Sequence, residues 1–209
     1  MARKSPTRPI IVAIAGGSAT GKSTLARLLA QELADLTPVI LNQDRYFRDF
    51  AELSEEERER QRTANHPDAV NWPAYHLAFT ALRDGNVAVE PAEGTRARQR
   101  EEPHPIGPAG VLLVEGLFAL WDEPTRLASD LRLYLEIDDD ERVLRRIHRD
   151  IAERNATVEG VITWFRRDVQ PNYPIYTSST KRYADLVVLT NKPSDNVAHI
   201  LAGAIRALR

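Results

Sequence analysis

A glycine-rich stretch near the start of the chain constrains the fold more than any other feature. It reads Gly16-Gly17-Ser18-Ala19-Thr20-Gly21-Lys22-Ser23-Thr24 and fits the pattern G-x-x-x-x-G-K-[ST]. An apolar run at residues 10–15 precedes it, and residues 23–36, which follow, carry leucines at helical spacing. Glycines between a strand and a helix let the backbone coil around a polyphosphate, with its N–H groups pointing inward. The stretch is therefore predicted to be a phosphate-binding loop, with Lys22 on the β- and γ-phosphates and Ser23 on Mg²⁺.

Short apolar runs alternate with helical segments along the rest of the chain. After the strand at residues 10–15, strands are predicted at residues 39–41, 111–114, 131–137 and 186–189, and helices at residues 140–154, 158–169 and 194–208. Repetition of strand and helix favours an α/β fold with a parallel sheet and right-handed crossovers. One domain over residues 1–209 is expected, with a flexible tail at residues 1–8.

Residues 45–110 form a predicted insertion. Residues 45–72 are rich in charged and aromatic side chains, and residues 90–110 are rich in proline and glycine. Irregular stretches of this length are typical of binding loops and lids. We expect this insertion to cover the acceptor of a phosphoryl group.

Composition narrows the classes of partner. The 209 residues include 28 Lys and Arg against 30 Asp and Glu, and this near balance argues against non-specific binding to nucleic acid. The chain has no cysteine, which excludes disulfides, cysteine nucleophiles and thiolate metal sites and fits a cytoplasmic protein. No apolar run approaches the roughly 18 residues that a membrane span needs. A small-molecule substrate is therefore expected, with no nucleic acid and no membrane as partner.

Two acidic residues follow predicted strands. Asp44 comes just after residues 39–41, and Glu115 follows the apolar run at residues 111–114. The carboxyl ends of parallel strands meet at one edge of the sheet, so both acids are expected to face the phosphate-binding loop. Asp44 suits a base for an attacking hydroxyl, and Glu115 with Ser23 suits the magnesium side. A helix cap or a loop ion pair is the alternative for each acid.

Four patches of sequence resemble the uridine kinase group of P-loop kinases, which also holds phosphoribulokinase-like enzymes. They are the stretch at residues 16–24, Gln43-Asp44-Arg45-Tyr46-Phe47, His66-Pro67-Asp68-Ala69-Val70, and a series from residue 133 to residue 188 that includes Arg145-Arg146-Ile147-His148-Arg149-Asp150 and Thr180-Lys181-Arg182-Tyr183-Ala184-Asp185. Their order and spacing hold over roughly residues 10–190. The resemblance implies a P-loop NTPase-type parallel sheet flanked by helices, with a small acceptor-binding insertion and a lid near residues 150–160.

The resemblance also implies an activity. It implies transfer of the γ-phosphate of ATP or GTP, with Mg²⁺, to the 5′-hydroxyl of uridine, cytidine or a related nucleoside, in pyrimidine salvage, by a possible homo-oligomer. By position, Asp44 matches the general base, and Arg149 and Arg154 match arginines near the acceptor and the closing lid. Ion pairs along a helix, such as Glu141–Arg145 and Arg146–Asp150, are the alternative for these arginines, and they are the favoured interpretation for Arg142 and Arg145.

The acceptor side departs from the pattern of this group. Asn65 stands where an aspartate for the sugar hydroxyls is expected, and Trp164 stands in place of a glutamine. Residues 91–100 lack the aromatic residue and the histidine of a base pocket, and one lid arginine is missing. Uridine itself is therefore expected to be a weak acceptor. Arg96, Arg98 and Arg100 suit an anionic acceptor or a solvated loop, and the loop is the favoured interpretation.

Several other side chains could contact the acceptor. Tyr46, Phe47 and Trp164 could stack on a base, although core packing is the commoner role of an aromatic residue. Asn65 could bind hydroxyls. His66 could polarise the acceptor or fix the loop before Pro67, and we favour the second role.

The sequence leaves other functions open beside a nucleoside kinase. One is a kinase of another small alcohol, such as pantothenate, ribulose 5-phosphate or nicotinamide riboside. Another is a catalytically weak nucleotide-binding module that has lost its acceptor pocket. A GTPase-type switch is disfavoured because Asn191-Lys192-Pro193-Ser194-Asp195 places its acid one residue late and no D-x-x-G motif occurs.

Overall fold

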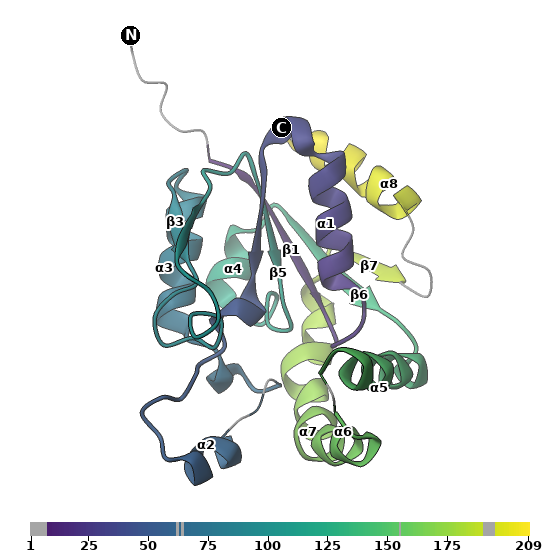
Figure 1. The fold of residues 1–209 in the computed structure, drawn as a ribbon. Helices are drawn as coiled ribbons and strands as arrows, with labels where there is room; N and C mark the ends of the chain where they lie inside the picture. The colour runs from purple at the N-terminus through teal and green to yellow at the C-terminus, as the bar shows by residue number, and fades with distance from the viewer. Residues whose placement is uncertain (1–7, 62, 64, 155, 190–194) are drawn as a thin grey trace.

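A five-stranded parallel sheet forms the centre of the structure (Figure 1). The computed structural model describes residues 8–61, 63, 65–154, 156–189 and 195–209, without the side chains of residues 59–61 and 153–154. The strand order is β2-β5-β1-β6-β7. The strands are β1 (Ile10–Gly16), β2 (Pro38–Asn42), β5 (Val111–Glu115), β6 (Leu131–Glu136) and β7 (Leu186–Leu189). The predicted α/β fold is confirmed, and each predicted strand lies within one residue of its expected bounds.

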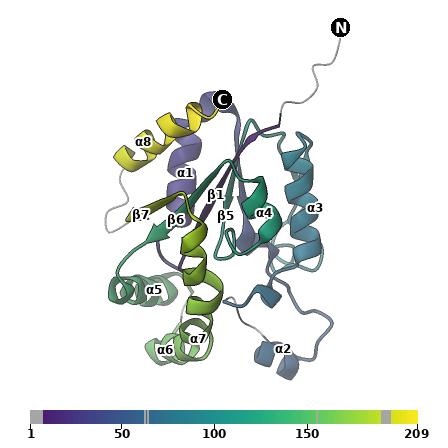
Figure 2. The same ribbon diagram turned by 180° about the vertical axis from the view of Figure 1, so that it is seen from behind.

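The two faces of the sheet are covered by different helices, because side chains alternate along β1. Residues 10, 12 and 14 pack in a core with α1 (Lys22–Glu32) and α8 (Asp195–Arg206). Residues 11, 13 and 15 pack in a second core with α3 (Trp72–Arg83). Figures 1 and 2 show α1 and α8 on one side of the sheet and α3 with α4 (Glu123–Ala128) on the other. None of the described helices is long and apolar enough to cross a membrane.

The remaining helices lie beyond the carboxyl ends of the strands (Figure 1). They are α2 (Glu55–Gln61), α5 (Asp139–Arg154), α6 (Val158–Trp164) and α7 (Gln170–Asn172). The helix predicted at residues 158–169 is α6 followed by a π-helical turn at Phe165–Val169, and a second π-helical turn covers Tyr173–Thr177. Single 3₁₀ turns cover Ala34–Leu36, Gln43–Tyr46, Pro67–Ala69 and Ser178–Tyr183.

The predicted insertion contains more regular structure than expected. It holds α3 and a hairpin of β3 (Ala88–Glu90) and β4 (His104–Ile106). Neither α3 nor α4 is among the predicted helices, although both have start signals. The Asn71 side chain accepts a hydrogen bond from the Ala74 N–H at 3.3 Å, and the Asp122 side chain accepts one from the Thr125 N–H at 3.1 Å. An N-cap with proline in the first turn is a sequence signature that identifies such a helix.

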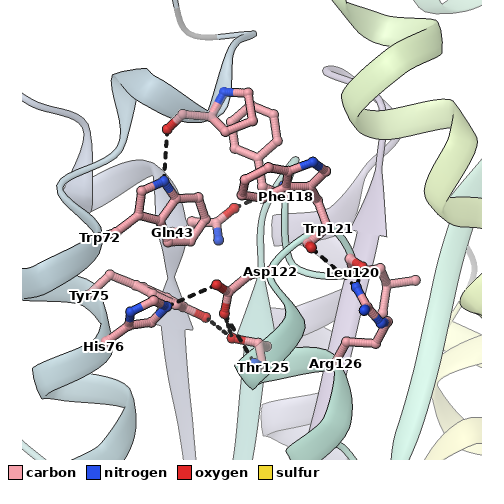
Figure 3. A network of polar contacts seen from close by, with 11 residues as sticks. Gln43, Trp72, Tyr75, His76, Phe118, Leu120, Trp121, Asp122, Thr125 and Arg126 are labelled. Atoms are coloured by element: carbon pink, nitrogen blue, oxygen red, sulfur yellow. Dashed lines mark hydrogen bonds and ion pairs between the residues drawn. The ribbon is translucent and has the colours of Figure 1, made fainter.

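A polar network fastens α3 to α4 (Figure 3). The Tyr75 hydroxyl lies 2.8 Å from Thr125 Oγ1, and His76 Nε2 lies 2.9 Å from Asp122 Oδ1. The Asp122 carboxylate is buried and also accepts a hydrogen bond from the Thr125 hydroxyl at 2.6 Å. Because buried polar groups that lose a partner are costly, this network holds the insertion in one position on the sheet.

Two predicted segments fall largely outside the described residues. Of the expected tail at residues 1–8, only Arg8 is described, and its guanidinium pairs with Asp130 at 3.3 Å. Residues 191–194 of the segment weighed as a guanine-reading loop are also outside the described part of the chain.

Candidate active site

The phosphate-binding loop joins β1 to α1, as predicted. Neighbouring atoms leave little room for a side chain at the first two glycines of this loop. A Cβ atom at Gly16, where φ is 147°, would lie 2.5 Å from the Leu135 carbonyl oxygen, and one at Gly17 would lie 2.9 Å from Arg142 Cδ. The loop is therefore packed tightly between the end of β6 and helix α5: a side chain at Gly16 would clash with backbone, and one at Gly17 would force the Arg142 side chain to move.

Three predicted side chains meet at the start of α1. The Lys22 ammonium is buried and donates a hydrogen bond to the Gly17 carbonyl at 2.8 Å. The Ser23 hydroxyl donates one to Glu115 Oε1, also at 2.8 Å, and only 2% of Glu115 is exposed. The sequence correctly placed Glu115 beside the loop, because β5 is the neighbour of β1 in the sheet.

Burial governs the charges of this group. It lowers the pKa of the Lys22 ammonium, against the opposing effect of the Glu115 and Asp44 carboxylates. It raises the pKa of the Glu115 carboxyl, and the Asp44 charge raises it further. The Asp44 carboxylate therefore acts on the pKa of both Lys22 and Glu115, which places Asp44 in the same electrostatic environment as the loop.

Asp44 follows β2 in a short 3₁₀ turn. The turn forms because the Asn42 side chain accepts a hydrogen bond from the Asp44 N–H at 2.7 Å. The Asp44 carboxylate is exposed and lines a cavity of about 710 Å³. Ser18 of the phosphate-binding loop and Arg149 of α5 line the same cavity, and the Arg149 guanidinium lies 3.4 Å from the Ser18 hydroxyl. Asp44, the phosphate-binding loop and Arg149 therefore all border the same cavity.

The insertion supplies the other wall of this cavity. Asn65, Phe47 and three residues of the loop after β3, Arg96, Ala97 and Arg100, line it. Backbone contacts hold these segments together: the Arg96 N–H donates a hydrogen bond to the Phe47 carbonyl at 2.9 Å. The cavity wall therefore depends on three stretches that are far apart in the sequence.

Asn65 is buried at the edge of the cavity. Only 5% of it is exposed, and its Nδ2 atom has no hydrogen-bond partner among the described residues. A buried donor of this kind calls for an acceptor atom from a bound molecule or a water. Asn65 thus lines the same cavity as Asp44, and its role as an acceptor-binding residue stays a prediction.

Helix α5 presents a row of arginines to the site. Arg146 lines the cavity, stacks on the Trp164 ring at 3.9 Å and pairs with Asp150 at 3.4 Å. Trp164 also lines the cavity. The Glu141–Arg145 and Arg146–Asp150 pairs are confirmed. The role of Arg146 in the cavity was missed, although it shares a helix face with Arg149 at a spacing of three residues.

Arg142 makes the ion pair predicted for it and, in addition, a contact that the sequence did not indicate. The sequence favoured a helix-face ion pair for it, and the pair with Asp139 exists at 2.9 Å. However, only 5% of Arg142 is exposed, and its guanidinium stacks on the Tyr173 ring at 3.9 Å against Gly17. It covers the phosphate-binding loop because α5 runs beside that loop. The side chain of Arg154, the last residue of α5, lies outside the described residues.

Two candidate acceptor contacts, Tyr46 and His66, lie away from the cavity. Tyr46 is fully buried and meets the Tyr75 ring edge-on at 5.5 Å, because its turn directs it into the core below the insertion. His66 does not line the cavity: its Nε2 atom lies 2.8 Å from the Tyr176 hydroxyl, and its Nδ1 atom accepts a hydrogen bond from the Asp68 N–H at 3.2 Å. His66 fixes the loop before Pro67, which was its favoured interpretation.

The oxygen ligands at the start of α1 match the needs of a magnesium ion that arrives with a nucleotide. No group of three or more His, Asp or Glu side chains among the described residues could hold a metal ion. Mg²⁺ commonly takes only one or two protein oxygens and completes its shell with phosphate oxygens and water. The Ser23 hydroxyl and the Glu115 carboxylate are such oxygens, 2.8 Å apart, so they fit a magnesium ion that arrives with a nucleotide.

Comparison with known proteins settles the family. Residues 11–197 match the sequence profile of the Phosphoribulokinase / Uridine kinase family. The chain belongs to this family. The uridine kinase of Lactobacillus johnsonii is 34% identical over 204 residues, which cover 96% of each chain. The uridine kinase of Limosilactobacillus reuteri is 30% identical over 200 residues, or 95% of this chain and 91% of that one. The family assignment makes the protein a phosphotransferase that acts on a hydroxyl group.

Solved structures of other kinases share the fold. Phosphoribulokinase from Rhodobacter spheroides superposes with a TM-score of 0.66 at 17% identity, over 87% of this chain and 70% of that one. D-glycerate 3-kinase from Cryptococcus neoformans superposes with a TM-score of 0.61 at 14% identity, over 90% and 89%. The expected P-loop NTPase-type sheet flanked by helices is confirmed.

Proposed function

We propose that the protein is a nucleoside kinase that transfers the γ-phosphate of ATP to the 5′-hydroxyl of uridine, cytidine or a related nucleoside. The uridine kinase relatives support a nucleoside as acceptor. The observation that carries the proposal is the position of Asp44. Its carboxylate lines the same cavity as Ser18 and Arg149, and it acts electrostatically on both Lys22 and Glu115.

Each group then has a role in an in-line transfer. The backbone of residues 16–24 and the Lys22 ammonium bind the triphosphate. Asp44 orients the acceptor hydroxyl and takes its proton, while the 5′ oxygen bonds to the γ-phosphorus and the bond to the β,γ-bridging oxygen breaks to release ADP. Arg149, with Arg154 near the lid, stabilises the charge of the transferring group. Ser23 and Glu115 would hold Mg²⁺, which neutralises charge on the phosphates when bound.

The acceptor is held by the opposite wall. Asn65 contacts the sugar, and the rings of Phe47 and Trp164 pack against the base. GTP as an alternative donor, pyrimidine salvage and assembly into a homo-oligomer stay predictions of the family resemblance, and a cytoplasmic location stays a prediction from the composition.

A transfer assay tests the proposal. The purified protein is incubated with Mg·ATP and, separately, with uridine, cytidine, pantothenate and ribulose 5-phosphate, and the products are identified by mass spectrometry. We expect a nucleoside 5′-monophosphate in an amount equal to the ADP formed. Phosphorylation of pantothenate or ribulose 5-phosphate alone, or ADP with only inorganic phosphate, would contradict it.

A further inference from the structure

The cavity wall is rich in guanidinium groups. Its lining includes five arginines against two carboxylates; the arginines are Arg45, Arg96, Arg100, Arg146 and Arg149, and the carboxylates are those of Asp44 and Glu101. Most of this positive charge is already compensated. Arg45 pairs with Glu101 at 2.7 Å and with Glu90 at 3.2 Å.

Arg100 is the exception within the described part of the chain. Its backbone N–H donates to the Ala97 carbonyl at 3.0 Å, and its exposed side chain has no carboxylate of a described residue within ion-pair distance. Arg98, two residues earlier, does not line the cavity and is paired with Glu93 at 2.9 Å and Glu102 at 3.5 Å. The same loop thus carries Arg98, which is ion-paired outside the cavity, and Arg100, which lines the cavity without a carboxylate partner among the described residues.

This loop packs against the segment that follows Asp44. It is anchored to the segment after Asp44, because Arg96 donates backbone and Nε hydrogen bonds to the carbonyls of Phe47 and Arg48, at 2.9 and 3.0 Å. The Arg96 guanidinium carbon lies 5.9 Å from the centre of the Phe47 ring. The sequence favoured a solvated loop for these arginines, and the structure places two of the three at the cavity.

Asn65 adds a second, independent indication. It is a neutral residue where the family resemblance led us to expect an aspartate, and its buried Nδ2 atom has no partner among the described residues. A carboxylate at this point would repel an anion in the cavity, whereas an amide does not. Among the described residues, the wall therefore offers the Asn65 amide N–H and the guanidinium of Arg100 to the acceptor.

We propose that the acceptor is an anionic nucleoside whose base carries a carboxylate, and that Arg100 binds this carboxylate. The inference rests on the proposed nucleoside kinase activity and names the substrate class of that same site. A guanidinium matches a carboxylate with two parallel hydrogen bonds, which supports a carboxylate. A phosphate, with nearly two negative charges, would call for a second unpaired cation.

The test compares two nucleosides of the same shape. Uridine-5-carboxylic acid and uridine-5-carboxamide differ by one charge, and uridine and uridine 3′-monophosphate complete the series. We expect kcat/KM for the acid to exceed that for the carboxamide by about tenfold or more, the usual value of a charge-assisted hydrogen bond. In Arg100→Gln this ratio falls towards one, whereas the matched control Arg98→Gln retains it. Circular dichroism checks that both variants fold.

Each of the other outcomes contradicts one named part of the proposal. Equal use of acid and carboxamide overturns the anionic acceptor and leaves the nucleoside kinase intact. A preference that survives in Arg100→Gln overturns the assignment to Arg100, and a preference for uridine 3′-monophosphate overturns the carboxylate. If no nucleoside in the series is phosphorylated, the proposed function itself falls.

Discussion

The two sides of the cavity are built from very different lengths of chain. The phosphate side is one continuous stretch, residues 16–24, supported by the adjacent strand that ends at Glu115. The acceptor side combines residues 44–47, 65 and 96–101, and contacts between distant segments hold it together, such as the backbone hydrogen bond from Arg96 to Phe47 and the ion pair of Arg45 with Glu101. A local loop keeps its sequence signature because its backbone must coil, whereas a wall of distant segments can change its side chains and keep its shape.

This difference sets what a substitution does on each side. A change on the phosphate side removes a group that every turnover requires. A change on the acceptor side alters which molecule fits and how tightly it binds. The following variants separate the two sides, in order of decreasing effect.

Lys22→Ala has the largest expected effect. The ammonium is the buried cation of the phosphate-binding loop, so its loss should lower kcat/KM by about a thousandfold, comparable to removal of a key electrostatic group. Steady-state kinetics measures this, and circular dichroism shows whether the fold is intact. Gln31→Ala, on an exposed position of the same helix, is the control and should retain activity. Turnover unchanged in Lys22→Ala would remove the loop from the reaction.

Asp44→Asn should lower kcat by about a hundredfold or more, because an amide cannot accept the proton of the hydroxyl. The dissociation constant of ATP should change little, since the carboxylate lies at the cavity and not in the loop. Asp49→Asn is the matched control in the same segment, where the carboxylate only accepts a hydrogen bond from the Ala51 N–H at 3.1 Å. A fully active Asp44→Asn enzyme would exclude Asp44 as the base.

Trp164→Ala should act on the acceptor alone. The ring lines the cavity and stacks on Arg146, so its loss should raise the KM for the nucleoside about tenfold, the typical value of one base stacked on an aromatic ring. The KM for ATP should stay within about twofold of the wild-type value. A rise in the KM for ATP of the same size would show that the two sides are not separable at this residue.

Trp72→Phe should have the smallest effect. It removes the hydrogen bond from the Trp72 indole N–H to the Pro67 carbonyl at 2.9 Å, worth about 1 kcal/mol, which corresponds to a Tm decrease of about 2–4 °C. Because Pro67 follows the acceptor segment, the KM for the nucleoside should rise about twofold. The control is Trp121→Phe, because the Trp121 indole N–H makes no hydrogen bond with the described residues. This variant should keep the wild-type KM for the nucleoside. Equal KM values for the nucleoside in both variants would show that this hydrogen bond does not contribute to acceptor binding.

The sequence predicts the phosphate side of the site better than the acceptor side. Residues 16–24, Asp44 and Glu115 could be placed from sequence, because strand order brings the carboxyl ends of β1, β2 and β5 to one edge. Arg142 could not, because its burial arises from Tyr173, thirty-one positions later in the chain. Tyr46 and Phe47 are adjacent in sequence, and only the direction of the turn decides that one enters the core and the other the cavity.

The arginines of the insertion show the same limit. Arg98 and Arg100 lie two residues apart in the same loop, but Arg98 forms an ion pair with Glu93 whereas Arg100 lines the cavity. This distinction depends on how the loop after β3 lies across the segment after Asp44, which is a long-range contact. Local pattern therefore predicts the phosphate side in detail and the acceptor side only as a region.

Binding of a bisubstrate compound tests most directly that the loop and the acceptor cavity form one continuous site. In this compound a tetraphosphate joins adenosine to uridine through their 5′ oxygens, and calorimetry compares its Kd with those of ATP and of adenosine tetraphosphate. If the two sites are continuous, it binds about a hundredfold more tightly than either and competes with both ATP and the nucleoside. An affinity no better than that of adenosine tetraphosphate, with no competition against the nucleoside, would contradict the account.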